Sequence, residues 1–172
     1  MSVLEKDIHI QFPHFTVLKA SAGSGKTYAL TERFVQFLLS EKIPHHHLRN
    51  ILAITFSNNA SKEMKERVLE WLKSLYFEDP KTVEELTRIV TMERTSLVER
   101  AGKVIDAILR HFPDFQVRTI DSFMATIFRS SAIDFGYAPD FEILMNSDPL
   151  LEYAFNLYLK EVKDVQLLLQ AG

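Results

Sequence analysis

The sequence predicts an α/β fold in which helices flank a parallel sheet. Short apolar runs with strand character alternate with longer stretches in which apolar residues recur at helical spacing. This alternation is the order expected when each strand of a parallel sheet is followed by a helix. The same fold is indicated by a glycine-containing string, Ala20–Thr27, that lies between the first apolar run and the first helical stretch.

The predicted elements follow one another along the whole chain. Strands are expected at Thr16–Lys19, Ile51–Thr55 and Val117–Ile120, with a further extended piece at Phe141–Leu144. Helices are expected from Thr27 to before Pro44, from about Ala60 to Asp79–Pro80, at Val83–Val90, at Ser96–Arg110 and from Ser122 to about Phe135. A last helix is predicted to start at Asp148–Pro149, with Asp as the cap and Pro at the first helical position.

The predicted helices differ in which faces are apolar. The first is expected to place apolar residues on one face and polar residues opposite: Leu30, Phe34, Phe37 and Leu38 against Thr31, Glu32, Arg33 and Gln36. The second carries a core face of Met64, Val68, Trp71, Leu72 and Leu75. Nothing after the last helix could cover its apolar residues, Leu150, Leu151, Phe155, Leu157 and Leu159. We therefore expect the chain to be a fragment of a longer protein.

Composition excludes several classes of protein. The net charge is -3, so bulk charge does not indicate nucleic-acid binding, and any such contact has to be local. The absence of cysteine excludes disulfides and thiolate zinc sites. The first residues are charged and no apolar run approaches a membrane span, so we expect a soluble, cytoplasmic protein without a membrane partner. The triplet His45–His47 is interpreted as a solvated loop, with a metal site as the alternative.

The string ASAGSGKT matches the phosphate-binding P-loop pattern, with Ala in place of the first Gly. Its residues are Ala20, Ser21, Ala22, Gly23, Ser24, Gly25, Lys26 and Thr27. The glycines let successive N–H groups point at phosphate oxygens, and the following helix adds the positive end of its dipole. We expect Lys26 to contact the β- and γ-phosphates and Thr27 to bind Mg²⁺, which makes both catalytic candidates. This motif alone leaves open ATP or GTP, and a kinase, a GTPase or a motor.

A second motif narrows these choices. The string ILAITFSNNASKEMKERV, Ile51–Val68, resembles motif Ia of the Rep/UvrD-type superfamily 1 DNA helicases, TFTNKAAxEMxxR. The matching residues are Thr55, Phe56, Asn58, Ala60, Glu63, Met64 and Arg67. The resemblance implies that Thr55, Phe56 and Asn58 lie on a single-stranded DNA track, where an aromatic ring stacks on any base and polar groups bind phosphate. Asn59 replaces the family's usual Lys, and the alternative is that Phe56 is a core aromatic and Ser57–Asn59 only caps a helix.

A third string, VRTIDSFMATIFR, is similar to the TxHSF motif of the same family. Thr119, Ser122 and Phe123 match, and the resemblance implies that Thr119 and Ser122 contact DNA. Asp121 replaces the usual His, and the alternative is that Asp121–Ser122 is simply a helix cap. The following DFGYAPDFEIL resembles the RecB/AddA helicase–nuclease branch (exodeoxyribonuclease V beta). Gln11 lies too close to the P-loop to read the adenine as in UvrD or Rep, which also favours this branch.

The resemblance implies a fold, an activity and partners. We expect a truncated RecA-like P-loop NTPase domain at 1–129 (helicase domain 1A) and the start of a helical insertion (1B-like) at 130–172. The parent protein is then expected to be an ATP-dependent DNA helicase of repair or recombination, using ATP and Mg²⁺. Its expected partners are single-stranded DNA and other subunits of a helicase–nuclease complex.

Other interpretations stay open at this stage. The chain contains no apolar strand that ends in the paired acidic residues of the family's Mg²⁺ motif. We therefore expect these residues alone to bind nucleotide weakly and to hydrolyse little. The rivals are a P-loop kinase or other small NTPase that does not act on DNA, and a scaffold derived from a decayed helicase.

Overall fold

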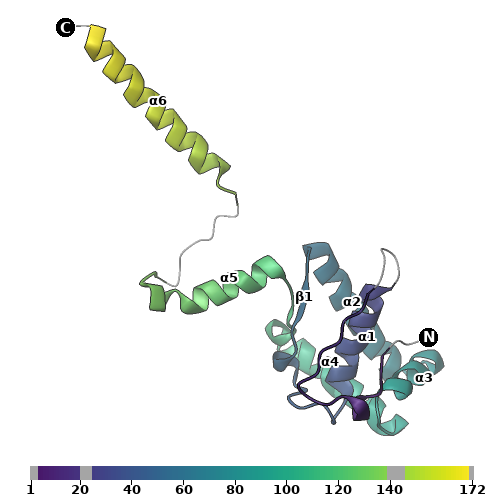
Figure 1. The fold of residues 1–172 in the computed structure, drawn as a ribbon. Coiled ribbons are helices and arrows are strands. Elements are labelled where there is room, and N and C mark those ends of the chain that lie inside the picture. The colour runs from purple at the N-terminus through teal and green to yellow at the C-terminus, as the bar shows by residue number, and fades with distance from the viewer. Residues whose placement is uncertain (1–3, 20–24, 139–145, 171–172) are drawn as a thin grey trace. The chain divides into compact units, whose positions relative to one another are not determined.

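The computed structural model describes residues 4–19, 25–138 and 146–170 (Figure 1). The chain divides into two compact units, Met1–Met124 and Ala125–Gly172. In the first unit lie the helices α1 (Lys26–Leu39), α2 (Asn58–Tyr76), α3 (Pro80–Ile89) and α4 (Arg94–Arg110). The strands β1 (Ala53–Thr55) and β2 (Val117–Thr119) pair in parallel, with Ala53 opposite Val117 and Thr55 opposite Thr119. The predicted combination of helices with a parallel sheet is therefore confirmed.

The predicted strand at Thr16–Lys19 is wrong. These residues form no regular element, and all are exposed, Val17 by 62%. A strand needs a neighbour for its backbone N–H and C=O groups, and among the described residues the sheet contains only β1 and β2. The extended piece predicted at Phe141–Leu144 lies outside the described residues. For the other elements the predicted order holds.

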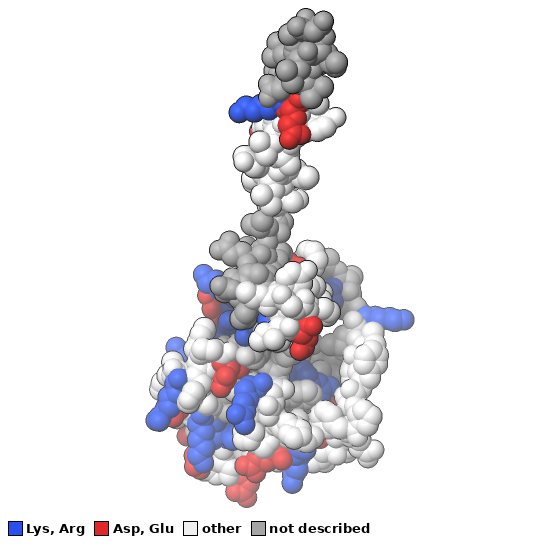
Figure 2. Space-filling view, turned by 90° about the vertical axis from the view of Figure 1, so that its left-hand side faces the viewer, with Lys and Arg blue, Asp and Glu red and all other residues white. Residues whose placement is uncertain are grey.

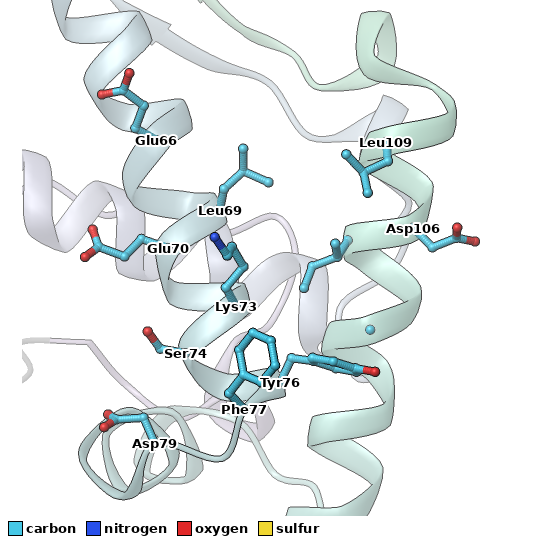
Figure 3. A pocket seen from close by; sticks show the side chains of 12 residues that line it. Glu66, Leu69, Glu70, Lys73, Ser74, Tyr76, Phe77, Asp79, Asp106 and Leu109 are labelled. Atoms are coloured by element: carbon cyan, nitrogen blue, oxygen red, sulfur yellow. The ribbon is translucent and has the colours of Figure 1, made fainter.

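The helix α2 is the centre of the first unit. It packs against α1, α3, α4 and both strands, and the views in Figures 1 and 3 show α2 alongside α4. Its predicted core face is confirmed, since Met64, Val68, Leu72 and Leu75 are fully buried and Trp71 is half-buried. At about 25 cal/mol per Å² of apolar area, burial of this kind supplies most of the favourable free energy of folding.

The polar face predicted on α1 is not a solvent face. Thr31, Glu32 and Gln36 are each at most 2% exposed, whereas Leu30 is 41% exposed. The N-terminal segment and α3 both contact this side of the helix. Gln36 joins these parts, because its Nε2 donates to the backbone oxygens of Glu5 at 2.9 Å and Ile89 at 2.8 Å.

A buried carboxylate fixes the N-terminal segment in place. Asp7 is 1% exposed and accepts hydrogen bonds from the hydroxyls of Ser40 at 2.5 Å and Thr91 at 2.6 Å, and from the Thr91 backbone N–H at 3.0 Å. Burial by itself raises the pKa of Asp7, but these hydrogen bonds outweigh it and hold the pKa below its ordinary value. Asp7 therefore connects the segment before the P-loop to the ends of α1 and α3.

The second unit contains the rest of α5 (Ile120–Ser131), a short turn at Ile133–Phe135 and α6 (Asp148–Gln170). The last helix begins at the predicted Asp148, and the carbonyl of Ser147 accepts the backbone N–H groups of Leu150 and Leu151. Its predicted apolar residues, Leu150, Leu151, Phe155, Leu157 and Leu159, are all exposed by 40% or more. No described helix has the length and apolar character that crossing a bilayer requires.

Candidate functional site

The predicted phosphate-binding residues open α1. Ala20, Ser21, Ala22, Gly23 and Ser24 lie outside the described residues, and Gly25 precedes the helix with φ 84°. This left-handed conformation favours glycine, because a Cβ would crowd the backbone. Lys26 and Thr27 form the first turn and are exposed, and that turn carries no acidic residue. The positive end of the α1 dipole therefore has no carboxylate within its own first turn.

Tyr28 fixes this first turn to the core. Its hydroxyl donates to Glu85 Oε2 at 3.2 Å, and its ring meets Trp71 edge-on at a centroid distance of 5.2 Å. Burial and the neighbouring Glu85 carboxylate raise the pKa of Tyr28 to about 12, so the hydroxyl stays a donor at neutral pH. The residue after Thr27 is thus held by α2 and α3, which leaves Lys26 and Thr27 on an anchored turn. The sequence interpretation missed this residue.

Residues of the second and third motifs meet at the carboxyl end of the sheet. Thr55 and Thr119 end neighbouring parallel strands and lie opposite each other in the register. The Thr55 hydroxyl lies 3.1 Å from the carbonyl oxygen of Ser57 and 3.4 Å from that of Arg118. Loops that follow parallel strands gather at one edge, which is where open α/β sheets bind ligands.

Phe56 projects from the loop between β1 and α2. Its side chain is 93% exposed, so the alternative that made it a core aromatic is wrong. The capping half of that alternative is right: Ser57 is the N-cap of α2, and its side chain accepts the Ala60 N–H at 3.2 Å. Asn58 is the first residue of α2 and is exposed. This part of the chain therefore presents an aromatic ring and an amide to solvent.

Thr119, rather than Asp121, caps the next helix. The helix α5 starts directly after β2, and the Thr119 hydroxyl accepts the backbone N–H of Ser122 at 3.2 Å. The predicted cap at Asp121–Ser122 is therefore wrong, because the helix begins before these residues. Asp121 lies within the first turn and is exposed, where a carboxylate favours the positive end of the helix dipole.

A buried hydroxyl joins the two motifs. Ser61 on α2 donates to the carbonyl oxygen of Val117 on β2 at 2.8 Å, and Ser61 is 9% exposed. The sequence interpretation passed over Ser61. A small polar residue at the start of an apolar helix face, three positions before Met64, was the available signal, because a buried hydroxyl needs a partner.

Charged side chains on one face of the molecule do not gather by sign. On the face shown in Figure 2, Lys and Arg side chains are interspersed with Asp and Glu. In the described part of the chain, no three His, Asp or Glu side chains gather in a group that could hold a metal ion. At the histidine triplet, His46 Nδ1 lies 2.9 Å from the Ile43 carbonyl oxygen and its ring stacks on His47, while His45 is exposed.

Known proteins resemble this chain over most of its length. The UvrD/REP helicase N-terminal domain family matches residues 6–170. The chain is 30% identical over 148 residues to an ATP-dependent helicase/nuclease subunit of Exiguobacterium sibiricum, a match that covers 83% of this chain and 11% of that protein. The corresponding protein of Clostridioides difficile is 28% identical over 124 residues, 69% of this chain and 10% of that protein. ATP-dependent DNA helicase PcrA of Bacillus subtilis is 58% identical over 52 residues, 30% of this chain and 7% of the helicase.

These matches show the family of the chain and the share of its relatives' length that it spans. The chain spans about a tenth of the length of the curated helicase/nuclease proteins that it matches. The family match covers all three motifs, from the P-loop to the helix that follows Thr119. The chain therefore belongs to the UvrD/REP helicase N-terminal domain family.

Proposed function

We propose that this chain is the ATP-binding N-terminal part of an ATP-dependent DNA helicase that acts in repair or recombination and resembles the helicase/nuclease relatives. It forms part of a RecA-like domain, with residues 1–129 as domain 1A and residues 130–172 as the start of a 1B-like helical insertion. Family membership supports this proposal over a P-loop kinase, because a kinase does not account for the second and third motifs.

The nucleotide end of the site is proposed at Ala20–Thr27. Binding of a nucleoside triphosphate here is supported by Gly25 at φ 84°, by the exposed side chains of Lys26 and Thr27, and by the absence of carboxylates from the first turn of α1. Lys26 binds the β- and γ-phosphates, and the Thr27 hydroxyl supplies one oxygen ligand to Mg²⁺, which prefers oxygen donors. Bound Mg²⁺ neutralises charge on the triphosphate. Hydrolysis needs an acidic motif that these 172 residues do not contain, so we propose that the chain alone binds nucleotide weakly and hydrolyses little.

The DNA end of the site is proposed at the carboxyl edge of the sheet. The observation that carries the proposal is the alignment of Thr55 with Thr119 beside a fully exposed Phe56. Phe56 stacks on a base, while Thr55, Asn58 and Ser122 bind the sugar–phosphate backbone without reading sequence. Thr119 sets the start of α5 and so positions Ser122. Other members of a helicase–nuclease complex are further proposed partners.

The test compares Phe56→Ala with the wild-type 172-residue chain in a single-stranded oligonucleotide binding assay. Loss of one stacked base costs about 1–3 kcal/mol, so affinity should fall by roughly 5- to 150-fold. Phe155→Ala is the control, because Phe155 is 60% exposed and lies outside every motif. If neither the wild-type chain nor Phe56→Ala binds the oligonucleotide, the DNA track is wrong and a P-loop NTPase that does not act on DNA is favoured.

A further inference from the structure

An open groove of about 1080 Å³ lies between α2 and α4. The two helices run in opposite directions on either side of it in Figure 3, from Glu66 to Tyr76 on α2 and towards Leu109 on α4. Its lining includes the apolar side chains Leu69, Tyr76, Phe77, Ile105 and Leu109. None of the residues proposed to bind nucleotide or DNA lines this groove, so it is a separate feature of the first unit.

Three apolar side chains of the groove are exposed to solvent. Phe77 is 75% exposed, Leu109 is 74% exposed and Tyr76 is 49% exposed. The rings of Tyr76 and Phe77 meet edge-on at a centroid distance of 5.4 Å. Large apolar side chains that gather on one surface, unlike scattered ones, indicate a binding surface. Aromatic rings are also the side chains that most often anchor a protein partner.

A glycine shapes the floor of the groove. A Cβ on Gly102 would lie 3.0 Å from one carbon of the Tyr76 ring and 3.2 Å from another. The Tyr76 ring therefore lies against the bare backbone of α4, and any larger residue at position 102 has to displace it. Glycine in a helix interior destabilises the helix by about 1 kcal/mol relative to alanine. The close packing of the Tyr76 ring explains why glycine nevertheless occupies position 102.

The rim of the groove is acidic. Among its lining residues are four carboxylates, Glu66, Glu70, Asp79 and Asp106, and a single cation, Lys73. Lys62 pairs with Glu66 at 3.9 Å and Arg110 pairs with Asp106 at 2.9 Å. Exposed pairs of this kind contribute at most about 1 kcal/mol and are readily exchanged for other cations. The rim therefore favours a partner that brings positive charge.

We propose that this groove binds one amphipathic helix of a partner protein, with an apolar stripe against Tyr76, Phe77 and Leu109 and with Lys or Arg on its flanks. Two antiparallel helices offer a third helix a groove for its ridge of side chains. The acidic rim repels the phosphates of nucleic acid and of anionic lipid. A second copy of this chain is disfavoured as well, since a two-fold contact would oppose one acidic rim with another.

The test uses the 172-residue chain and two synthetic helical peptides with the same leucine stripe, one with Lys flanks and one with Glu flanks. Binding is measured by fluorescence anisotropy at low and high salt. The Lys peptide should bind about ten-fold more tightly or better, a difference of about 1.4 kcal/mol, and the preference should shrink as salt screens the rim. Equal affinity of the two peptides would overturn the proposal.

Variants distinguish peptide binding in the groove from non-specific hydrophobic binding. Phe77→Ser, Leu109→Ser and Gly102→Ala should each weaken binding of the Lys peptide, and Glu70→Lys should reduce the preference for it. Ile133→Ser is the matched control, because Ile133 is 72% exposed and outside the groove. Circular dichroism verifies that each variant is folded. Binding that survives Phe77→Ser and Leu109→Ser, or a dimer in sedimentation analysis that Phe77→Ser abolishes, would refute the partner helix and, in the second case, identify a second copy as the occupant.

Discussion

The hydroxyl of Ser61 donates a buried 2.8 Å hydrogen bond to the carbonyl oxygen of Val117. This bond ties the first turns of α2 to β2, and so it joins the motif that contains Phe56 to the motif that contains Thr119. The register of the sheet places Thr55 opposite Thr119. The relative position of the two motifs proposed to contact DNA therefore depends on one side-chain bond as well as on the strand pairing.

Replacement of Ser61 by Ala should lower the free energy of unfolding by about 1–2 kcal/mol, because the buried Val117 carbonyl loses a donor. Urea denaturation followed by circular dichroism measures the change. Ser96→Ala is the control: Ser96 is exposed on α4, and surface changes of this kind usually stay within about 0.5 kcal/mol. Equal effects of the two substitutions would show that the Ser61 bond contributes nothing to stability.

Thr119→Val should destabilise the protein by about 1 kcal/mol, because valine keeps the shape and strand preference but removes the acceptor for the Ser122 N–H. Thr119→Ser keeps the hydroxyl and should retain most of the stability. Thermal unfolding and oligonucleotide binding are measured on both variants. If both lose the same stability, the packing of the methyl group rather than the cap is responsible.

Asp7→Asn should lower the free energy of unfolding by about 2–3 kcal/mol at neutral pH, because a charged acceptor of three hydrogen bonds becomes a neutral amide. Asp106→Asn, which removes an exposed carboxylate on α4, should change it by less than about 1 kcal/mol. Denaturant titrations at neutral pH measure both changes. A loss in Asp7→Asn no larger than that in Asp106→Asn would contradict the stabilising role of the buried carboxylate.

The Asp7 contribution also depends on pH. Its pKa is lowered below the ordinary 3.8 in the folded protein. The carboxylate therefore stabilises the fold fully above the unfolded pKa, and this stability is lost as the pH falls through the folded value. Titrations below pH 4 should show a steeper loss of stability in wild type than in Asp7→Asn. Parallel acid profiles would mean that Asp7 does not titrate differently in the folded state.

Lys26→Ala should weaken Mg²⁺–ATP binding by roughly 10- to 150-fold, the equivalent of about 1.5–3 kcal/mol for a lost charged hydrogen bond. Stability should change by less than about 0.5 kcal/mol, because the side chain is exposed. Isothermal titration calorimetry measures the affinity, with Lys19→Ala as a control for a nearby exposed lysine. Unchanged affinity in Lys26→Ala would remove this lysine from the nucleotide site.

Much of the fold could be predicted because hydrophobic periodicity is a local signal. The helices and the positions of β1 and β2 follow from local sequence patterns, such as the spacing of Met64, Val68 and Leu72. The failure at Thr16–Lys19 has a different origin, since a strand exists only with a hydrogen-bonding neighbour and no local pattern reports one. The buried polar side of α1 was missed for the same reason: Gln36 is covered by partners distant in sequence, Glu5 and Ile89.

In the candidate site too, local motifs could be predicted from the sequence, whereas contacts between distant elements could not. The motifs identified Thr55, Phe56 and Thr119, and the structure brings Thr55 and Thr119 together through the strand register. Ser61 holds these two motifs together, and Tyr28 holds the first turn of α1. Neither role could be assigned from spacing, because the partners come from other elements.

The helix α2 begins directly after the loop that exposes Phe56 and ends one residue before Phe77. Its 19 residues correspond to roughly 28 Å of rise, and no glycine or proline interrupts them. Sharp kinks in helices occur mainly at proline, glycine or a bulge, so an uninterrupted helix connects its two ends as one stiff element. In the proposed assignments, α2 thus connects the DNA strand at its amino end to a partner helix at its carboxyl end.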